Sequence, residues 1–161
     1  MGHRILARQL FVHVGLKRQA LHVAVFANFD ELFATLVILI PEVLHDGQNP
    51  EHFAVALSYD PTGDGAPILL AKGADHMAKI IREEAAKHGV EMFSAPPLAR
   101  ALYFSTKLDH PVPEALYLAV AQVIAYVFSL ADIRPGVQPM MRPSPKVPPS
   151  MQFDVDGKLV N

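Results

Sequence analysis

Hydrophobic and polar positions alternate along the middle of the chain in a way that predicts β-strands. Apolar and small side chains alternate over residues 53–58, a pattern typical of a strand with one buried face. The turn-forming sequence of residues 60–65 follows, and residues 67–71 are apolar enough for a second strand. We therefore expect two strands joined by a loop.

A spacing of three and four residues between apolar positions then predicts helices. Residues 73–85 place their apolar side chains on one helix face, and Gly89 is a typical stop signal. A short strand over residues 90–93 separates this helix from another over residues 98–106. The last helix, residues 115–128, has one strongly polar side chain, so we expect protein to cover it on nearly all sides. The predicted fold class is α/β, a small mixed sheet of about four strands surrounded by helices.

The two ends of the chain differ in composition from the central domain, which we place at residues 49–131. Residues 1–48 form an apolar N-terminal segment without an assigned role. Their stretch 20–44 contains asparagine, aspartate and glutamate, which disfavours a membrane-spanning helix and favours a packed or interfacial one. Within it, residues 36–40 are the best candidate for a strand. Residues 132–161 are rich in proline and lack an apolar period, which predicts a flexible, disordered tail.

Composition and charge exclude several classes of function. The 161 residues are 51% hydrophobic and 19% charged, which is typical of one soluble globular domain, and a net charge of −2 gives no support for nucleic-acid binding. No cysteine is present, and the eight histidines lack the spacing of a zinc site. Residues 60–71 imitate the start of a calcium loop, but Ala71 occupies the position of the required glutamate. We therefore expect neither a metal nor another cofactor.

The dipeptide Asn49-Pro50 can support a reaction of the backbone itself. Proline has no N–H, so the usual attack of the following backbone nitrogen on the asparagine side chain is closed. The Asn49 side-chain nitrogen can instead attack its own backbone carbonyl, close a succinimide ring and expel the Pro50 nitrogen. This route needs a turn that fixes the attack geometry, a proton acceptor and donors for the oxyanion. Glu51 and His52 are the adjacent candidates, and the alternative is an ordinary turn before a strand.

The residues around this dipeptide resemble those of a known family. The sequence 49–57 is similar to the Asn-Pro-Thr-His cleavage motif and the following strand in the cytosolic C-terminal domain of the FlhB, YscU and SctU family of type III secretion export switch proteins. Five further blocks resemble family blocks in the same order, namely residues 65–67, 71–75, 81–83, 96–103 and 124–127. Together the blocks cover roughly half of the chain.

The resemblance implies a small α/β domain that cleaves itself at the motif while both pieces stay associated. Asn49 would be the nucleophile and Pro50 would supply the leaving nitrogen, with His52 assisting the reaction or supporting the loop. In this family, cleavage lets the export gate change its class of substrate, so the activity would be one self-cleavage and not enzymatic turnover. A surface that contacts substrates or supports the loop would be formed by Lys72, Asp75, Pro97, Leu98 and Arg100.

The resemblance also implies partners and a location. The partners would be other export-gate proteins, export substrates or their chaperones, and the protein that controls hook or needle length. The location would be the cytoplasmic face of the bacterial inner membrane. The long proline-rich tail favours a flagellar over a virulence-associated system.

Two departures from the family leave alternatives open. Glu51 replaces the usual threonine, and residues 1–48 do not resemble the membrane helices, charged linker or strand that precede the motif in the family. A truncated paralogue, a fused foreign N-terminus and a misassigned start would each explain the second departure. Absence of the strand before the motif would remove the strain that cleavage needs, so the alternative function is a non-cleaving truncated paralogue or a binding module that docks export substrates. A small α/β hydrolase is the remaining alternative, although no nucleophile elbow or phosphate loop supports it.

Overall fold

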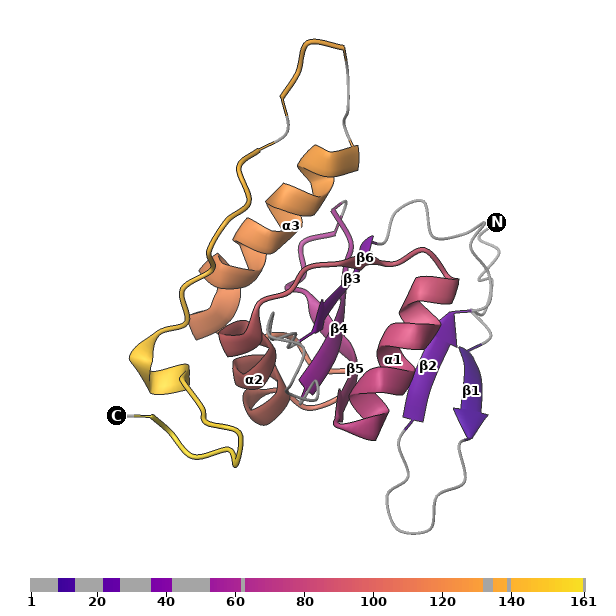
Figure 1. Cartoon of the computed structure of the whole chain (residues 1–161), viewed down its shortest axis with the longest axis vertical. Helices are drawn as coiled ribbons and strands as arrows, with labels where there is room; N and C mark the ends of the chain where they lie inside the picture. Colours follow the sequence, from indigo (N-terminus) through magenta and orange to yellow (C-terminus); the bar gives the residue numbers. More distant parts are fainter. Residues whose placement is uncertain are drawn as a thin grey trace.

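A four-stranded mixed sheet flanked by helices forms the centre of the computed structural model (Figure 1). The structure describes residues 9–13, 22–26, 36–41, 53–61, 63–131, 135–138 and 140–160. The strands of the sheet are β3 (Leu36–Pro41), β4 (Phe53–Tyr59), β5 (Ile68–Ala74) and β6 (Glu91–Met92). Their order is β5-β4-β3-β6; β3, β4 and β5 are antiparallel neighbours, and β6 runs parallel to β3. The predicted α/β class with a small mixed sheet is confirmed.

Helices cover both faces of this sheet. They are α1 (His76–Lys87), α2 (Pro96–Ser105), the 3-10 helix η2 (Glu114–Leu116) and α3 (Tyr117–Ala131). Because successive side chains of a strand point to opposite faces, neighbouring residues of β4 enter different parts of the core. Ala54 packs with Ala78 and Ile81 of α1, whereas Val55 and Leu57 belong to the larger cluster that includes side chains of α2 and α3. The central strand is thus buried on both sides.

The order of elements from β4 to α3 is the one that the sequence predicts. The boundaries differ by a few residues: α2 begins at Pro96 and α3 ends at Ala131, and α1 begins at His76 and not at Gly73. The strand β5 continues to Ala74, and Asp75 turns the chain with a φ of 47°. Gly73 permits a close approach between β5 and α1, because a Cβ at this position would lie 2.8 Å from the Cβ of Met77.

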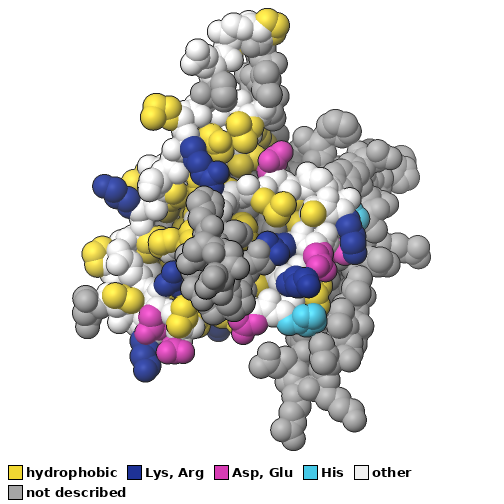
Figure 2. Space-filling view, in the orientation of Figure 1, with side chains coloured by type: hydrophobic (Ala, Val, Ile, Leu, Met, Phe, Trp, Pro, Cys, Tyr) yellow, Lys and Arg dark blue, Asp and Glu magenta, His cyan; other side chains and the backbone are white. Residues whose placement is uncertain are grey.

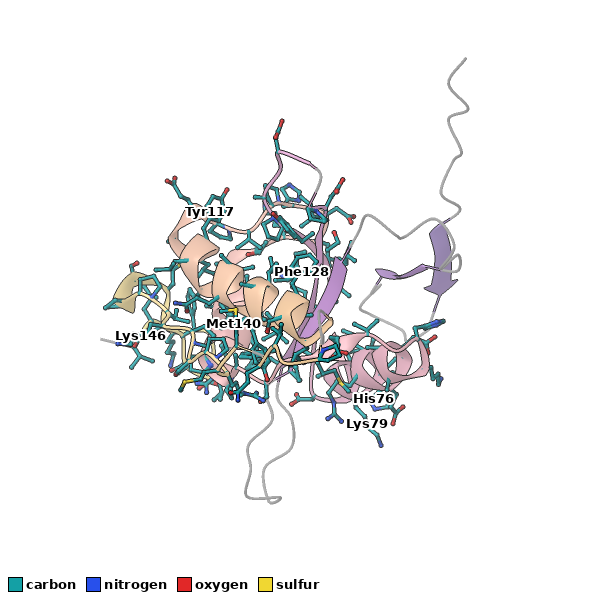
Figure 3. The ribbon with its side chains drawn as sticks, turned by 90° about the horizontal axis from the view of Figure 1, so that it is seen from above. His76, Lys79, Tyr117, Phe128, Met140 and Lys146 are labelled. Carbon is teal, nitrogen blue, oxygen red and sulfur yellow. The ribbon has the colours of Figure 1, made fainter. Side chains whose placement is uncertain are left out.

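The expectation that protein covers α3 on nearly all sides is wrong. Val123 and Val127 are buried, but Leu118 is 74% exposed, Tyr117 43% and Phe128 38%. Hydrophobic side chains gather over α3 in the space-filling view (Figure 2), and Figure 3 labels Tyr117, the first residue of α3, and Phe128 in its last turn. Hydropathy could not reveal this, because a helix rich in alanine, valine and leucine has the same composition whether one or two of its faces are covered.

The C-terminal segment also differs from expectation, because residues 140–160 pack against the helical side of the domain. Val147 is 6% exposed and belongs to the main core. Arg142 donates a hydrogen bond of 3.1 Å to the carbonyl of Ser94 and lies 4.6 Å from the ring centroid of Phe93. The segment returns beside α3 in Figures 1 and 3. Proline restricts the backbone before docking, so an extended segment with isolated apolar anchors can pack without any helical or strand period.

The remaining described elements are β1 (Gln9–His13), β2 (His22–Phe26) and the 3-10 helix η3 (Pro149–Met151). β1 and β2 pair as an antiparallel two-stranded sheet. The packed or interfacial helix expected over residues 20–44 is therefore wrong, since β2 and β3 fall within this stretch. β2 contains two valines and β3 one valine and two isoleucines, and these β-branched residues favour extended backbone. The strand expected over residues 36–40 is confirmed as β3.

Candidate functional site

The candidate reaction belongs to the segment between β3 and β4. Outside the described residues lie the four catalytic candidates, Asn49, Pro50, Glu51 and His52. Both flanks of the segment are described: β3 ends at Pro41, β4 begins at Phe53, and Pro41 pairs with Ala54. Residues 42–52 therefore connect two strands that are neighbours in one sheet and antiparallel to each other.

Phe53 is the first described residue after the motif, and aromatic rings of α2 hold it. Its side chain is 5% exposed, and its ring centroid lies 4.7 Å from that of Tyr103 and 5.3 Å from that of Phe104. Its backbone is paired with Ala74 of β5. Each ring pair of this kind stabilises a structure by about 0.5–1.5 kcal/mol beyond burial. The point where β4 begins is thus fixed by sheet pairing and by ring packing together.

Lys72 binds the C-terminal end of α2. Its Nζ donates hydrogen bonds of 2.9 Å to the carbonyl of Tyr103 and 2.8 Å to that of Thr106, and it lies 5.2 Å from the Tyr103 ring centroid. The last carbonyls of a helix lack partners within the helix, and a lysine can satisfy them. Partial burial lowers the pKa of Lys72 by desolvation. Lys72 therefore supports the helix end on which Phe53 packs.

The other predicted surface residues fall into separate places. Asp75 follows directly on Ala74, the partner of Phe53, so it lies at the same end of the sheet as Lys72. Pro97 and Leu98 lie in the first turn of α2, about one and a half helical turns from Tyr103. Leu98 is fully buried, so it contributes to the core and not to a surface.

Arg100 lies midway along α2 and contacts the C-terminal segment. Its Nη1 donates a hydrogen bond of 3.4 Å to the carbonyl of Phe153. Sequence reasoning missed the ring of Phe104, which connects Phe153 (centroids 5.5 Å apart) with Phe53. The Tyr103-Phe104 pair at the end of a predicted helix was a visible signal. Phe153 gave none, because no apolar period surrounds it.

Among the described residues, the features of a metal site and of a membrane-spanning helix are both missing. Within these ranges, histidine, aspartate and glutamate form no group of three or more that could hold a metal ion. No described helix combines the length and the apolar character needed to cross a bilayer. At the supposed calcium loop, the amide of Gly63 donates to the carbonyl of Asp60 (3.2 Å), as in an ordinary turn.

Comparison with known proteins relates the chain to one family. Residues 48–127 match the family described as "FlhB HrpN YscU SpaS Family". The chain is 49% identical over 82 residues to the flagellar biosynthetic protein FlhB of Yersinia enterocolitica. The matched region is 51% of this chain and 21% of that protein. It is 47% identical over 92 residues to the hypersensitivity response secretion protein HrcU of Ralstonia nicotianae, covering 56% of this chain and 26% of that protein.

A solved structure supports the same assignment. The crystal structure of the cytoplasmic domain of FlhB from Shewanella putrefaciens has a TM-score of 0.59 and 40% identity, and the match covers 72% of this chain and 86% of that chain. The fold and the sequence together define an α/β domain of the type III export class. The chain belongs to the FlhB, HrpN, YscU and SpaS family and contains the part that corresponds to the FlhB cytoplasmic domain. It spans about a quarter of the length of the curated relatives named above.

Proposed function

We propose that this chain works in a type III protein export apparatus of the flagellar kind and cleaves itself once between Asn49 and Pro50. One observation carries the proposal: the Asn-Pro dipeptide stands in the segment that joins β3 to β4, within the matched region of an export family. A connection between two paired strands has both ends fixed, which restricts the conformations that the dipeptide can adopt.

The proposed step is a rearrangement within the chain. The side-chain nitrogen of Asn49 forms a bond to its own backbone carbonyl carbon, and the bond from that carbon to the Pro50 nitrogen breaks. One proton moves from the attacking nitrogen to the leaving Pro50 nitrogen, and His52 carries it. The N-terminal piece then ends in a succinimide, which later takes up one water.

The sheet explains how the two pieces would stay together. After a cut, β3 belongs to the piece that ends at Asn49, and β4 belongs to the piece that starts at Pro50. These strands pair along their length, from Leu36 opposite Tyr59 to Pro41 opposite Ala54. β3 also lies between β4 and β6, so the N-terminal piece supplies an interior strand of the sheet. Cleavage would therefore free two chain ends while the fold remains.

We propose that this change at the motif switches the export gate from one class of substrate to another. The piece that starts at Pro50 enters the described sheet at Phe53, at the same end of the strands as Lys72. The partners would be other gate proteins, export substrates or their chaperones, and a protein that controls hook or needle length. The place of action would be the cytoplasmic face of the inner membrane.

The test compares the native chain with Asn49→Ala by denaturing intact-mass spectrometry after cell-free synthesis. We expect the native chain to yield two masses whose sum equals the whole chain, or exceeds it by one water, whereas Asn49→Ala stays intact. The rate should be first order and independent of protein concentration, because the nucleophile and the broken bond share one residue. Cleavage of Asn49→Ala at the same place would contradict the mechanism.

Glu51→Thr provides a companion variant. A carboxylate beside the reacting carbonyl disfavours the developing oxyanion, whereas a hydroxyl can donate a hydrogen bond to it. We therefore expect Glu51→Thr to cleave faster than the native chain in the same time course. An unchanged or lower rate would show that Glu51 does not oppose the reaction.

A docking module that remains uncut is the second candidate. The exposed apolar face of α3, with Tyr117, Leu118 and Phe128, favours it, since exposed apolar side chains in a group are typical of binding surfaces. A native chain that stays intact after long incubation at mildly alkaline pH would favour this function over self-cleavage.

A further inference from the structure

The C-terminal end of the described chain forms a small hairpin, residues 152–160. The amide of Val160 donates to the carbonyl of Gln152, and the amide of Asp154 donates to the carbonyl of Lys158, each at 2.8 Å. The Asp154 carboxylate closes the turn by accepting hydrogen bonds from the amides of Asp156 (2.9 Å) and Lys158 (2.8 Å). This hairpin is held by its own hydrogen bonds, so it can act as one unit.

The hairpin packs on the ring of Phe104. The ring centroids of Phe153 and Phe104 are 5.5 Å apart. Gly157 adopts a φ of 80°, and a Cβ there would lie 2.6 Å from Cε1 of Phe104. Glycine is therefore needed at this position for two reasons: the backbone is left-handed, and a side chain would collide with the ring.

Further contacts join the hairpin to the helical layer. Arg100 of α2 donates to the carbonyl of Phe153, and the side-chain nitrogen of Gln152 donates to the carbonyl of Val147 (2.9 Å), whose side chain lies in the core. These contacts fix the hairpin over the C-terminal half of α2. The ring of Phe104 then lies between the hairpin and the ring of Phe53.

We propose that the hairpin of residues 152–160 is a positioning element for the cleavage at Asn49-Pro50. By holding Phe104 it holds Phe53, where β4 begins after the motif. The inference rests on the proposed function and adds a control of it by the far end of the chain. Attack of the side-chain amide needs a geometry in which a misplacement of about 1 Å costs as much as a hundredfold in rate. A loosened start of β4 would therefore slow the reaction while the sheet persists, because β4 keeps its pairing with β3 and β5.

The test measures the first-order rate of cleavage in full-length Gly157→Ala after cell-free synthesis. Its matched control is Gly136→Ala, which has similar backbone strain (φ 89°) but would meet no described atom within 4 Å. We expect Gly157→Ala to cleave at least about tenfold more slowly than the native chain. Gly136→Ala should cleave at the native rate. Phe153→Leu, which removes one ring without backbone strain, should slow cleavage in the same direction.

A second measurement separates positioning from general loss of stability. In the uncut Asn49→Ala background, Gly157→Ala should raise amide hydrogen exchange over residues 53–55 and leave exchange in α3 unchanged. Native cleavage with equal rates in Gly157→Ala and Gly136→Ala would overturn the positioning role while the proposed function stands. Exchange that rises equally in α3 would also overturn it. A native chain that never cleaves would overturn the proposed function and this inference together.

Discussion

Two adjacent residues of β5, Lys72 and Gly73, hold helices on opposite faces of the sheet. Lys72 reaches across to the carbonyls at the end of α2, while its neighbour Gly73 lets α1 approach the strand. The first contact needs a long side chain with a charged end, and the second needs the absence of a side chain. Adjacent residues of one strand therefore serve opposite faces of the sheet.

Gly73→Ala should destabilise the domain. The added Cβ would lie 2.8 Å from Cβ and 3.0 Å from the backbone carbon of Met77, so α1 must shift. We expect a loss of about 1–3 kcal/mol in the free energy of unfolding, measured by urea denaturation. Gly65→Ala is the control, because a Cβ there would meet nothing within 4 Å, and it should leave stability unchanged. Equal stability of the two variants would contradict the packing described for β5 and α1.

Strands and helices with a clear period were predictable from the sequence, and those without one were not. The alternation in β4 and the helical spacing in α1 and α2 come from residues that face the core, so the sequence shows them directly. The described C-terminal residues 140–160 pack through single apolar side chains, such as Val147, that stand between prolines. Isolated contacts of this kind leave no periodic pattern in the sequence. At the candidate site, the motif could be identified from the residues alone. The support of Phe53 by Phe104 and the hairpin could not, because it joins residues far apart in the chain.

Opposite faces of the segment η2–α3 should respond differently to mutation. Leu116 is fully buried, whereas Leu118, two residues later, is 74% exposed. Leu116→Ala should cost about 2–5 kcal/mol of unfolding free energy, because it leaves a cavity in the main core. Leu118→Ala should change stability by less than about 0.5 kcal/mol. Urea denaturation of both variants tests the one-sided burial of α3, and a large cost for Leu118→Ala would contradict it.

The architecture as a whole suits a protein that is cut and remains folded. In the sequence, the dipeptide Asn49-Pro50 falls between two strands that are neighbours in the sheet, and helices cover both faces of that sheet. An interior strand supplied by the N-terminal piece can leave only if the core opens. The switch that we propose is therefore a local change at the motif, with the rest of the domain as its unchanging support.

One experiment tests this account most directly: mass spectrometry of the same purified sample under native and under denaturing conditions. In the native spectrum we expect one species with the mass of the whole chain, or one water more. In the denaturing spectrum we expect two species, corresponding to residues 1–49 and 50–161. Asn49→Ala should give the intact chain in both. A single intact mass for the native sequence under denaturing conditions would contradict self-cleavage, and separated pieces under native conditions would contradict the role of β3–β4 pairing.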